Sequence, residues 1–300
     1  MKPAQSTSPN SGGGEPNFPL SQDGGRGERV TCLLAVFAHP DDEGMASGTL
    51  SKAASNGVHV VLTCATRGEV GEISHPALAA PENLGDVREA ELRAACDVLG
   101  IKDLRLLGYR DSGMAGTPAN DDPRCYHQAN PEAATRQLVH LIRDVRPQVV
   151  VTHEPGGGYG HPDHIAVSRY TTAAFDLAGD PGAFPEAGQP WRPRRLYYAV
   201  LPRSMFKQMR RRMEALGLDA ASLDQFIVFE PGGIEEQVTH VVDVSTRVEA
   251  KRAAFNCHET QFGTAHPLRQ LPEEVMRGVF SREYFIQARP APAGSPDPPR

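Results

Sequence analysis

Residues 38–43, AHPDDE, place one imidazole and three carboxyl groups in six positions, directly after the apolar run 31–37. Residues 159–164, YGHPDH, place two more imidazoles and a carboxyl group after a second apolar run, 149–152. These side-chain types bind divalent metals and transfer protons. Because the strands of a parallel sheet end at one edge, where ligands bind in α/β folds, we expect the two clusters to share a metal ion.

A zinc site for hydrolysis takes three protein ligands from histidine and carboxylate side chains and leaves one position for water. His39, Asp42 and His164 would supply such a set. Proline at position 162 predicts that His161 caps a helix whose first turn holds Asp163 and His164. An HxxH pattern alone is weak evidence for a metal, so the prediction depends on its pairing with HPDD at a second strand end.

The segments that must position these clusters alternate short β-branched runs with helical stretches, which is typical of parallel βαβ units. Helices are predicted at 43–56 and 82–99, each followed by glycine, and after the start signal Asn130-Pro131. The sequence thus predicts an α/β fold: a three-layer, mostly parallel Rossmann-like sheet with helices on both faces. The expected strands are Val30–Phe37, Val58–Ala65, Leu104–Leu107, Val149–Thr152, Leu196–Leu201 and Val238–Val244.

The composition indicates the domain boundaries and the classes of partner that are expected. The chain has 300 residues and a net charge of -6, which provides no general basic surface for nucleic acid. Residues 1–28 and 290–300 are rich in Gly, Ser and Pro, so we expect two disordered tails around a single domain at 29–289. The cysteines form no CxxC pair, and no stretch has the roughly 20 apolar residues of a membrane span, so we expect a cytoplasmic protein without disulfides or a membrane partner.

The sequence resembles the PIG-L / LmbE-like family of zinc-dependent N-acetylglucosaminyl de-N-acetylases. GYRDSGM at 108–114 is similar to the branch of the family in actinobacterial thiol pathways, and AFNCHETQ at 254–261 is similar to the family's C-terminal motif. The resemblance covers about 31–169 and is looser beyond it, and residues 180–195 have no counterpart. Four motifs carry it: AHPDDE at 38–43, TRGEVGE at 66–72, REAELRAACDVLGI at 88–101 and YGHPDH at 159–164.

The resemblance implies that His39, Asp42 and His164 are the metal ligands, with zinc as the expected ion and iron(II) as the alternative. It implies that Asp41 is the general base and that His161 stabilises the oxyanion or protonates the leaving amine. The implied activity is a metal-dependent hydrolase, in which a metal-activated water removes the acetyl group of an N-acetylglucosaminyl small molecule.

Three further residues correspond to the substrate pocket of the family. Tyr159 is similar to a mobile tyrosine, and Arg88 and Asp111 match residues that contact the sugar. Arg88 could instead pair with Glu91 on its own helix face, and Asp111 could belong only to a turn.

Some structural and functional alternatives stay open. Asp41 or Glu43 could cap the following helix, and we expect this for Glu43, while His258 is expected to be structural. The chain could be an amidase of a glucosaminyl thiol conjugate or a non-catalytic sugar-binding protein. A non-haem iron oxygenase also uses two histidines and a carboxylate, but it predicts a barrel or jelly roll. The expected partner is a small amino-sugar substrate, and formation of a homo-oligomer is left open.

Overall fold

The computed structural model describes residues 30–217, 220–221, 234–264 and 266–290. Its centre is a seven-stranded sheet in the order β3-β2-β1-β4-β5-β7-β6. The first five strands are parallel, whereas β7 runs antiparallel to both β5 and β6, so the expected mostly parallel α/β sheet is confirmed. The strands are β1 (Cys32–Phe37), β2 (His59–Cys64), β3 (Asp103–Leu106), β4 (Val149–His153), β5 (Arg195–Val200), β6 (His240–Asp243) and β7 (Arg282–Arg289).

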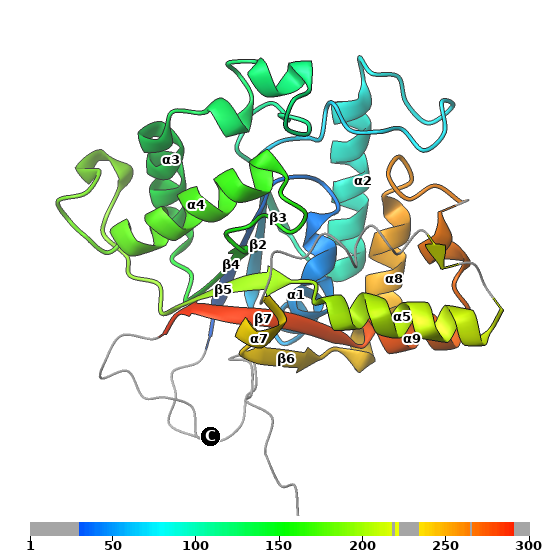
Figure 1. Ribbon diagram of the computed structural model, residues 1–300. Coiled ribbons are helices and arrows are strands. Elements are labelled where there is room, and N and C mark those ends of the chain that lie inside the picture. Colours follow the sequence, from blue (N-terminus) through cyan, green and yellow to red (C-terminus); the bar gives the residue numbers. More distant parts are fainter. Residues whose placement is uncertain (1–29, 218–219, 222–233, 265, 291–300) are drawn as a thin grey trace, which may run out of the picture.

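Helices cover both faces of the sheet, as Figure 1 shows, with α3 and α4 on one side and α1, α2 and α8 on the other. Residues of β1 alternate between two hydrophobic cores: Leu33 and Phe37 pack with the second group of helices, and Leu34 and Val36 with the first. The helices are α1 (Ser47–Ser55), α2 (Leu84–Leu99), α3 (Pro131–Val145), α4 (Pro162–Leu177), α5 (Arg203–Ala215), α7 (Ile234–Gln237), α8 (Val248–Cys257) and α9 (Glu273–Phe280).

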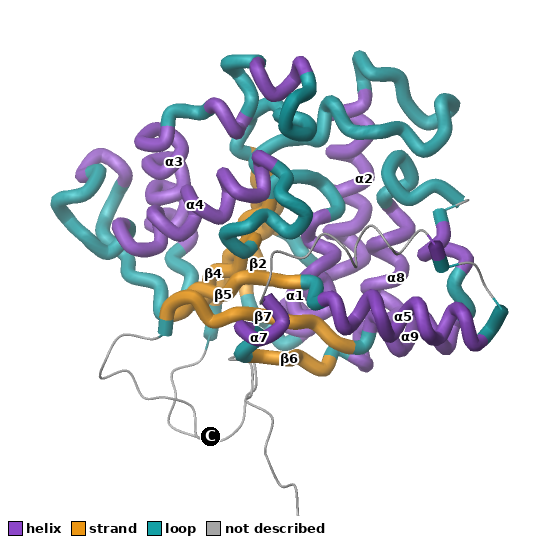
Figure 2. The backbone as a smooth tube through the Cα atoms, in the orientation of Figure 1, coloured by secondary structure: helices purple, strands orange, loops and turns teal. Residues whose placement is uncertain are grey.

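The two polar clusters follow adjacent parallel strands, β1 and β4. From β1 the chain continues to β2 on one side, and from β4 it continues to β5 on the other, so this edge is a topological switch point. Long loops gather at that end of the strands, at the top of Figure 2. Ligands bind at such points because the diverging connections leave a crevice between them.

One predicted helix needs correction, and one strand was not predicted. The helix expected from Glu43 begins at Ser47, and Asp42–Met45 form a 3-10 turn instead. Carboxylates in this turn accept hydrogen bonds from nearby backbone N–H groups, an arrangement that competes with the helix. Strand β7 was not predicted, because REYFIQAR carries three charges and few β-branched residues. The expected tails lie outside the described residues, apart from residue 290.

Residues 180–194 lie in the connection from α4 to β5, within the stretch 180–195 for which the sequence motifs suggested no counterpart. Their first part is held by Arg143 of α3, which is 3% exposed. Its guanidinium donates hydrogen bonds of 2.6–3.3 Å to five backbone carbonyls, those of Ala178, Asp180, Ala183, Phe184 and Gly188. One buried cation thus organises a connection whose regular structure is limited to a 3-10 turn at Pro185–Ala187.

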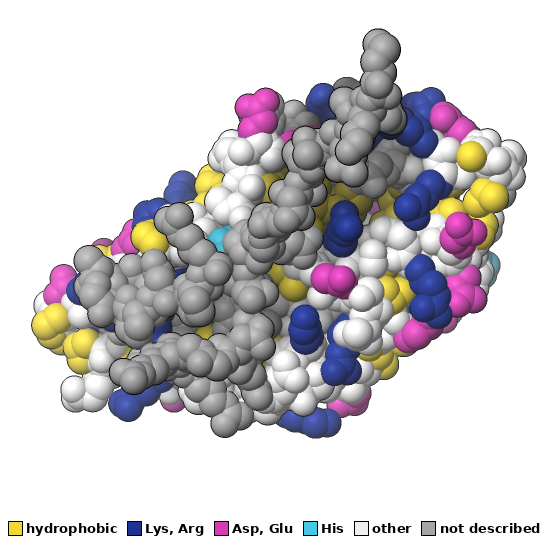
Figure 3. Space-filling model, turned by 90° about the horizontal axis from the view of Figure 1, so that it is seen from below, with side chains coloured by type: hydrophobic (Ala, Val, Ile, Leu, Met, Phe, Trp, Pro, Cys, Tyr) yellow, Lys and Arg dark blue, Asp and Glu magenta, His cyan; other side chains and the backbone are white. Residues whose placement is uncertain are grey.

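All five cysteines have free thiols, and four of them are buried. On the face seen from below in Figure 3, acidic and basic side chains are interspersed over the part that is coloured. No helix in the described ranges is both long enough and apolar enough to cross a bilayer.

Candidate metal centre and active site

Three potential ligand side chains meet where β1 and β4 end. Nδ1 of His39 lies 3.1 Å from Nε2 of His164 and 3.5 Å from Oδ2 of Asp42. Nε2 of His164 lies 3.3 Å from Oδ1 of Asp42. Tetrahedral zinc with bonds of about 2.0–2.1 Å separates its ligand atoms by about 3.3 Å. Each of these distances is close to that value, with the two histidines approaching different oxygens of Asp42, so the three side chains have the ligand types and the spacing that suit a divalent ion.

The outer nitrogens of both rings have acceptors, which decides where the ring protons sit. Nε2 of His39 lies 3.2 Å from Oδ2 of Asp163 and 3.5 Å from Oδ1 of Asp111. Nδ1 of His164 lies 3.2 Å from the carbonyl of Gly157. In the neutral tautomers in which each outer nitrogen donates its hydrogen, the inner nitrogens face each other as lone pairs. Burial lowers the pKa of His39, but hydrogen bonds to Asp111, Asp163 and Asp42 raise it by more, so an ion would have to displace the proton of the inner nitrogen. Two lone pairs beside a carboxylate form a site for a cation. The outer nitrogens contact a carboxylate and a backbone carbonyl, as is usual for metal-binding histidines.

His161 carries its ring hydrogen on Nε2, as His39 does and His164 does not. It is the N-cap of α4, as predicted, and its Nδ1 accepts a hydrogen bond of 3.2 Å from the backbone N–H of Asp163. The proton of the neutral ring is therefore on Nε2. Burial, together with the neighbouring His39 and His164, lowers the pKa of His161 to about 3. Although His161 lies close enough to belong to a metal cluster, it is a neutral hydrogen-bond donor rather than a lone-pair ligand.

Asp41, unlike Asp42, makes no side-chain hydrogen bond or ion pair with the described residues. Its backbone is left-handed, with φ 101°, and its carboxylate accepts no hydrogen bond from any described residue. Burial and the adjacent Asp42 carboxylate raise the pKa of Asp41 to about 8. The alternative role of Asp41 as a helix cap is not realised, since its side chain makes no hydrogen bond to the turn that follows it. A carboxyl group of this kind can take up and return a proton near neutral pH.

His153, the last residue of β4, is a site residue that sequence reasoning missed. Its Nε2 lies 3.1 Å from Oδ2 of Asp42, and its ring stacks on His164 with centroids 4.0 Å apart. Burial raises the pKa of Asp42, but His164 and His153 lower it by more, so this carboxyl group stays ionised. The available signal was a histidine at the end of the strand that precedes YGHPDH.

Arg88 of α2 contacts the loop that holds TRGEVGE. Its guanidinium donates to the carbonyls of Gly68, at 3.1 Å, and Glu72, at 2.9 Å. A Cβ at Gly71 would lie 2.3 Å from Nη1 of Arg88, so a side chain at this position would displace the guanidinium. The alternative pairing of Arg88 with Glu91 is wrong, because Glu91 accepts hydrogen bonds from Thr260 instead.

Asp111 lies at the same centre and is 3% exposed. One oxygen accepts the N–H of Gly113 at 2.8 Å and lies 3.5 Å from Nε2 of His39, while the other accepts the N–H of Val70 at 3.3 Å. Burial raises the pKa of Asp111, but hydrogen bonds from His39 and Gly113 lower it by more, and the net pKa falls below its usual range. Asp111 thus stabilises the turn that was the alternative to sugar binding, and it also contacts the imidazole of His39.

Tyr159 is at the rim of the centre and is 43% exposed. Its ring meets His164 edge to face at 5.3 Å and His161 at 6.0 Å. The loop that carries Tyr159 is held by Glu154, whose carboxylate accepts the backbone N–H groups of Gly156 and Gly158. The ring therefore lies over the two histidines on a glycine-rich loop.

Glu43 and His258 form a second feature that the sequence did not predict. Oε1 of Glu43 lies 2.6 Å from Nε2 of His258, and Oε2 accepts the N–H of Asp41 at 2.9 Å. Glu43 is therefore not the helix cap that we expected, and it connects the C-terminal part of the chain to the AHPDDE motif.

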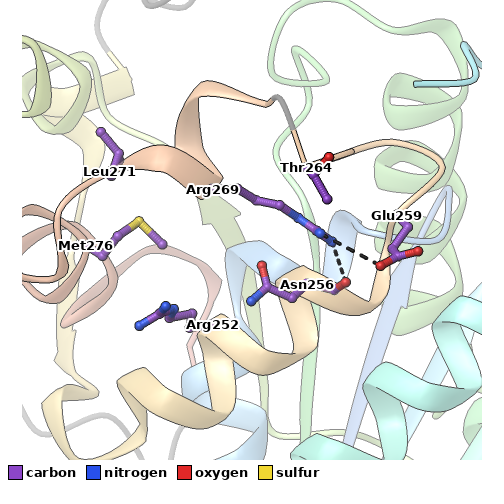
Figure 4. Close-up of a pocket in the computed structure, with 7 residues that line it drawn as sticks. All are labelled: Arg252, Asn256, Glu259, Thr264, Arg269, Leu271 and Met276. Carbon is purple, nitrogen blue, oxygen red and sulfur yellow. Dashed lines mark hydrogen bonds and ion pairs between the residues drawn. The ribbon is translucent and has the colours of Figure 1, made fainter. Parts of the chain in front are cut away.

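A separate hollow lies beside the end of α8 (Figure 4). None of the sequence-predicted site residues lines it. Its lining residues are Arg252, Asn256, Glu259, Thr264, Arg269, Leu271 and Met276.

The sequence of the chain also matches known proteins. The family model described as GlcNAc-PI de-N-acetylase (PIG-L) matches residues 34–175. The chain is 40% identical over 276 residues to the 1D-myo-inositol 2-acetamido-2-deoxy-alpha-D-glucopyranoside deacetylase of Thermobifida fusca, a match that covers 88% of this chain and 96% of that protein.

Two solved structures share the fold at low identity. One is N,N'-diacetylchitobiose deacetylase from Pyrococcus horikoshii, with a TM-score of 0.59 and 18% identity, covering 87% of this chain and 84% of the other. The other is GalB, the 4-carboxy-2-hydroxymuconate hydratase of Pseudomonas putida, with a TM-score of 0.58 and 17% identity, covering 89% and 100%. Their different reactions mean that the fold alone does not identify the activity. The sequence match to the deacetylase does carry that information, and the chain belongs to the PIG-L family of N-acetylglucosaminyl de-N-acetylases.

Proposed function

We propose that the protein hydrolyses the acetamide of an N-acetylglucosaminyl-inositol, releasing acetate and the free amino sugar. The observation that carries the proposal is that groups with three different chemical roles lie together at one point of the sheet edge. Two histidine lone pairs and a carboxylate face one another, a donor N–H lies beside them, and Asp41 has an unengaged carboxylate. The deacetylase of Thermobifida fusca, which matches nearly the whole chain, supports inositol as the group attached to the sugar.

His39, Asp42 and His164 would hold a divalent ion, which we propose to be zinc. When bound, such an ion lowers the pKa of a coordinated water to about 7 and polarises the carbonyl of the substrate. Asp41 accepts the proton of the attacking water. Nε2–H of His161 donates a hydrogen bond to the carbonyl oxygen as negative charge develops on it. The C–N bond then breaks, and protonated Asp41 returns its proton to the leaving nitrogen.

The remaining residues would bind and orient the sugar. Arg88 has a buried Nε without a hydrogen-bond partner among the described residues, and the Asp111 carboxylate retains acceptor capacity beyond its backbone contacts. We therefore assign both to sugar hydroxyls as well as to their loops. Tyr159 would cover the acetyl group, since its exposed ring lies over His161 and His164.

The test measures formation of the free amino sugar by purified, metal-defined protein, and release of acetate where the acyl group is acetyl. The substrates are N-acetylglucosaminyl-inositol, a cysteine conjugate of an acetylated glucosaminyl thiol, and N,N'-diacetylchitobiose. Chelation should abolish release and zinc should restore it, with iron(II) added anaerobically as the comparison. Full activity of demonstrably metal-free protein would contradict the metal site, and preference for either other substrate would contradict the inositol assignment.

A matched pair of variants tests the roles of the two aspartates. Asp42→Ala removes a ligand and should lose both metal and activity. Asp41→Asn is nearly isosteric and should retain the metal while kcat falls about 10²- to 10⁴-fold, because the proton acceptor is gone. If Asp41→Asn loses its metal and Asp42→Ala keeps it, the two assignments are reversed.

A further inference from the structure

The backbone of Asp41 has a conformation that residues other than glycine rarely adopt. Its φ of 101° and ψ of -25° lie at the bend between β1 and the 3-10 turn. Such a conformation persists only where neighbouring contacts hold it. One contact at this bend is the 2.9 Å hydrogen bond from the Asp41 N–H to Oε2 of Glu43. Because a side chain follows its own backbone, this bond helps to set the direction of the Asp41 carboxylate.

The Glu43 carboxylate is held in turn by His258. Nε2 of His258 lies 2.6 Å from Oε1 of Glu43, and the two side chains are 1% and 2% exposed. Nδ1 of His258 has no hydrogen-bond partner among the described residues, so Glu43 is the polar contact of this buried ring. Removal of His258 would leave one oxygen of Glu43 without a partner where solvent is excluded.

His258 is placed by contacts that do not involve Glu43. It follows α8 directly, and the next residues are tied to other elements. Thr260 donates from its N–H and its hydroxyl to Glu91 of α2, at 2.8 and 2.6 Å. Arg269 donates to the carbonyl of Asn256 and lies 3.9 Å from Glu259, as Figure 4 shows. The imidazole of His258 is therefore held in place independently of Glu43, and it fixes the Glu43 carboxylate through their hydrogen bond.

We propose that His258 is a positioning residue for the reaction, acting through Glu43 on Asp41. It touches neither the three candidate ligands nor His161. The inference rests on the proposed function, in which Asp41 transfers the proton. It assigns the C-terminal part of the chain a role in the geometry of the general base.

The chain offers a matched control on the same helix. Lys251 of α8 is buried, and its Nζ lies 2.5 Å from Oε1 of Glu283. The Glu283 carboxylate also accepts the N–H groups of Gly48 and Thr49 in α1, both at 2.8 Å. Lys251→Met thus breaks a buried ion pair that supports the same region without contacting Asp41.

The experiment compares kcat, KM, metal content and Tm for His258→Ala, His258→Gln and Lys251→Met. His258→Ala should lower kcat about 10- to 100-fold with KM and metal content unchanged, as expected for a displaced catalytic group. His258→Gln should recover much of kcat, because its amide N–H can donate to Glu43. Lys251→Met should lower Tm and leave kcat unchanged.

A double-mutant cycle separates positioning from a general structural effect. In protein that already carries Asp41→Asn, His258→Ala should cause no further loss of kcat, because the residue it positions no longer accepts a proton. An undiminished loss in that background, an equal loss in Lys251→Met, or wild-type kcat in His258→Ala would overturn the inference. Acetate release by the wild type and its loss in Asp41→Asn test the proposed function separately.

Discussion

The identity of the third metal ligand can be decided by experiment, because two sets of residues could supply it. Both sets contain Asp42 and His164, and they differ in having His39 or His153. Distance to Asp42 does not separate the candidates, since Nε2 of His153 lies 3.1 Å from Oδ2 and Nδ1 of His39 lies 3.5 Å from it. The partners of the second ring nitrogen do separate the two histidines. The second nitrogen of His39 faces carboxylates, whereas the one polar contact of His153 with a described residue is Asp42.

We therefore predict that His39 is the ligand and that His153 donates to Asp42 from outside the coordination sphere. A four-ligand zinc site binds with about 10–16 kcal/mol, so one ligand corresponds to about 3–4 kcal/mol, or about 10²- to 10³-fold in affinity. Loss of an outer hydrogen bond to a ligand typically costs about 10- to 100-fold. His39→Ala should thus weaken zinc binding as strongly as His164→Ala does, and more strongly than loss of His153.

The assay is competition for zinc against a chelator of known affinity, with metal content measured after gel filtration. His153→Phe is the suitable variant, because a phenyl ring can keep the stack on His164, whose centroid lies 4.0 Å away at an interplanar angle of 15°. His39→Ala should be metal-depleted and His153→Phe should retain most of its metal. Zinc-depleted His153→Phe beside fully loaded His39→Ala would refute the assignment and place His153 in the coordination sphere.

Four further predictions follow from single contacts. Arg88→Ala should lower the free energy of unfolding by about 3 kcal/mol, since two carbonyls lose a charged donor, and should lower kcat/KM without changing metal content; unchanged values in urea melts and kinetics would contradict both roles. Arg143→Met should cost at least about 3 kcal/mol in the same melts while kcat is retained, because its five carbonyl acceptors lie in the connection after α4. Burial lowers the pKa of His258, but Glu43 raises it by more, so the net pKa lies above the usual value of 6.5. The pair therefore stabilises the fold below pH 6.5, and this stabilisation is lost as the pH rises through the raised pKa. Tm should fall over this pH range in the wild type and fall less in His258→Gln. Chelation should lower Tm by about 8–16 °C, as expected when about 4 kcal/mol of binding at a 1,000-fold excess over Kd is removed, and an unchanged Tm would mean that no ion occupies the site.

The sequence by itself determined the local chemistry and its local support. AHPDDE and YGHPDH follow apolar runs, and those runs form adjacent parallel strands. The cap at His161 was predictable because the preference of proline for the first helical position acts between chain neighbours. The alternation of strands and helices was likewise enough to predict the α/β class, since its periodicity lies within each short segment.

Only the tertiary structure decided which distant residues complete the site. Glu43 meets His258 across 215 positions of sequence, and His153 reaches Asp42 across 111. Arg88 turned out to hold a loop rather than pair with Glu91 on its own helix. The insertion of β7 between β5 and β6 was also unforeseen. The physical reason is common to all of these: such contacts depend on strand order and on the packing of helices against the sheet, which no local pattern of residue types specifies.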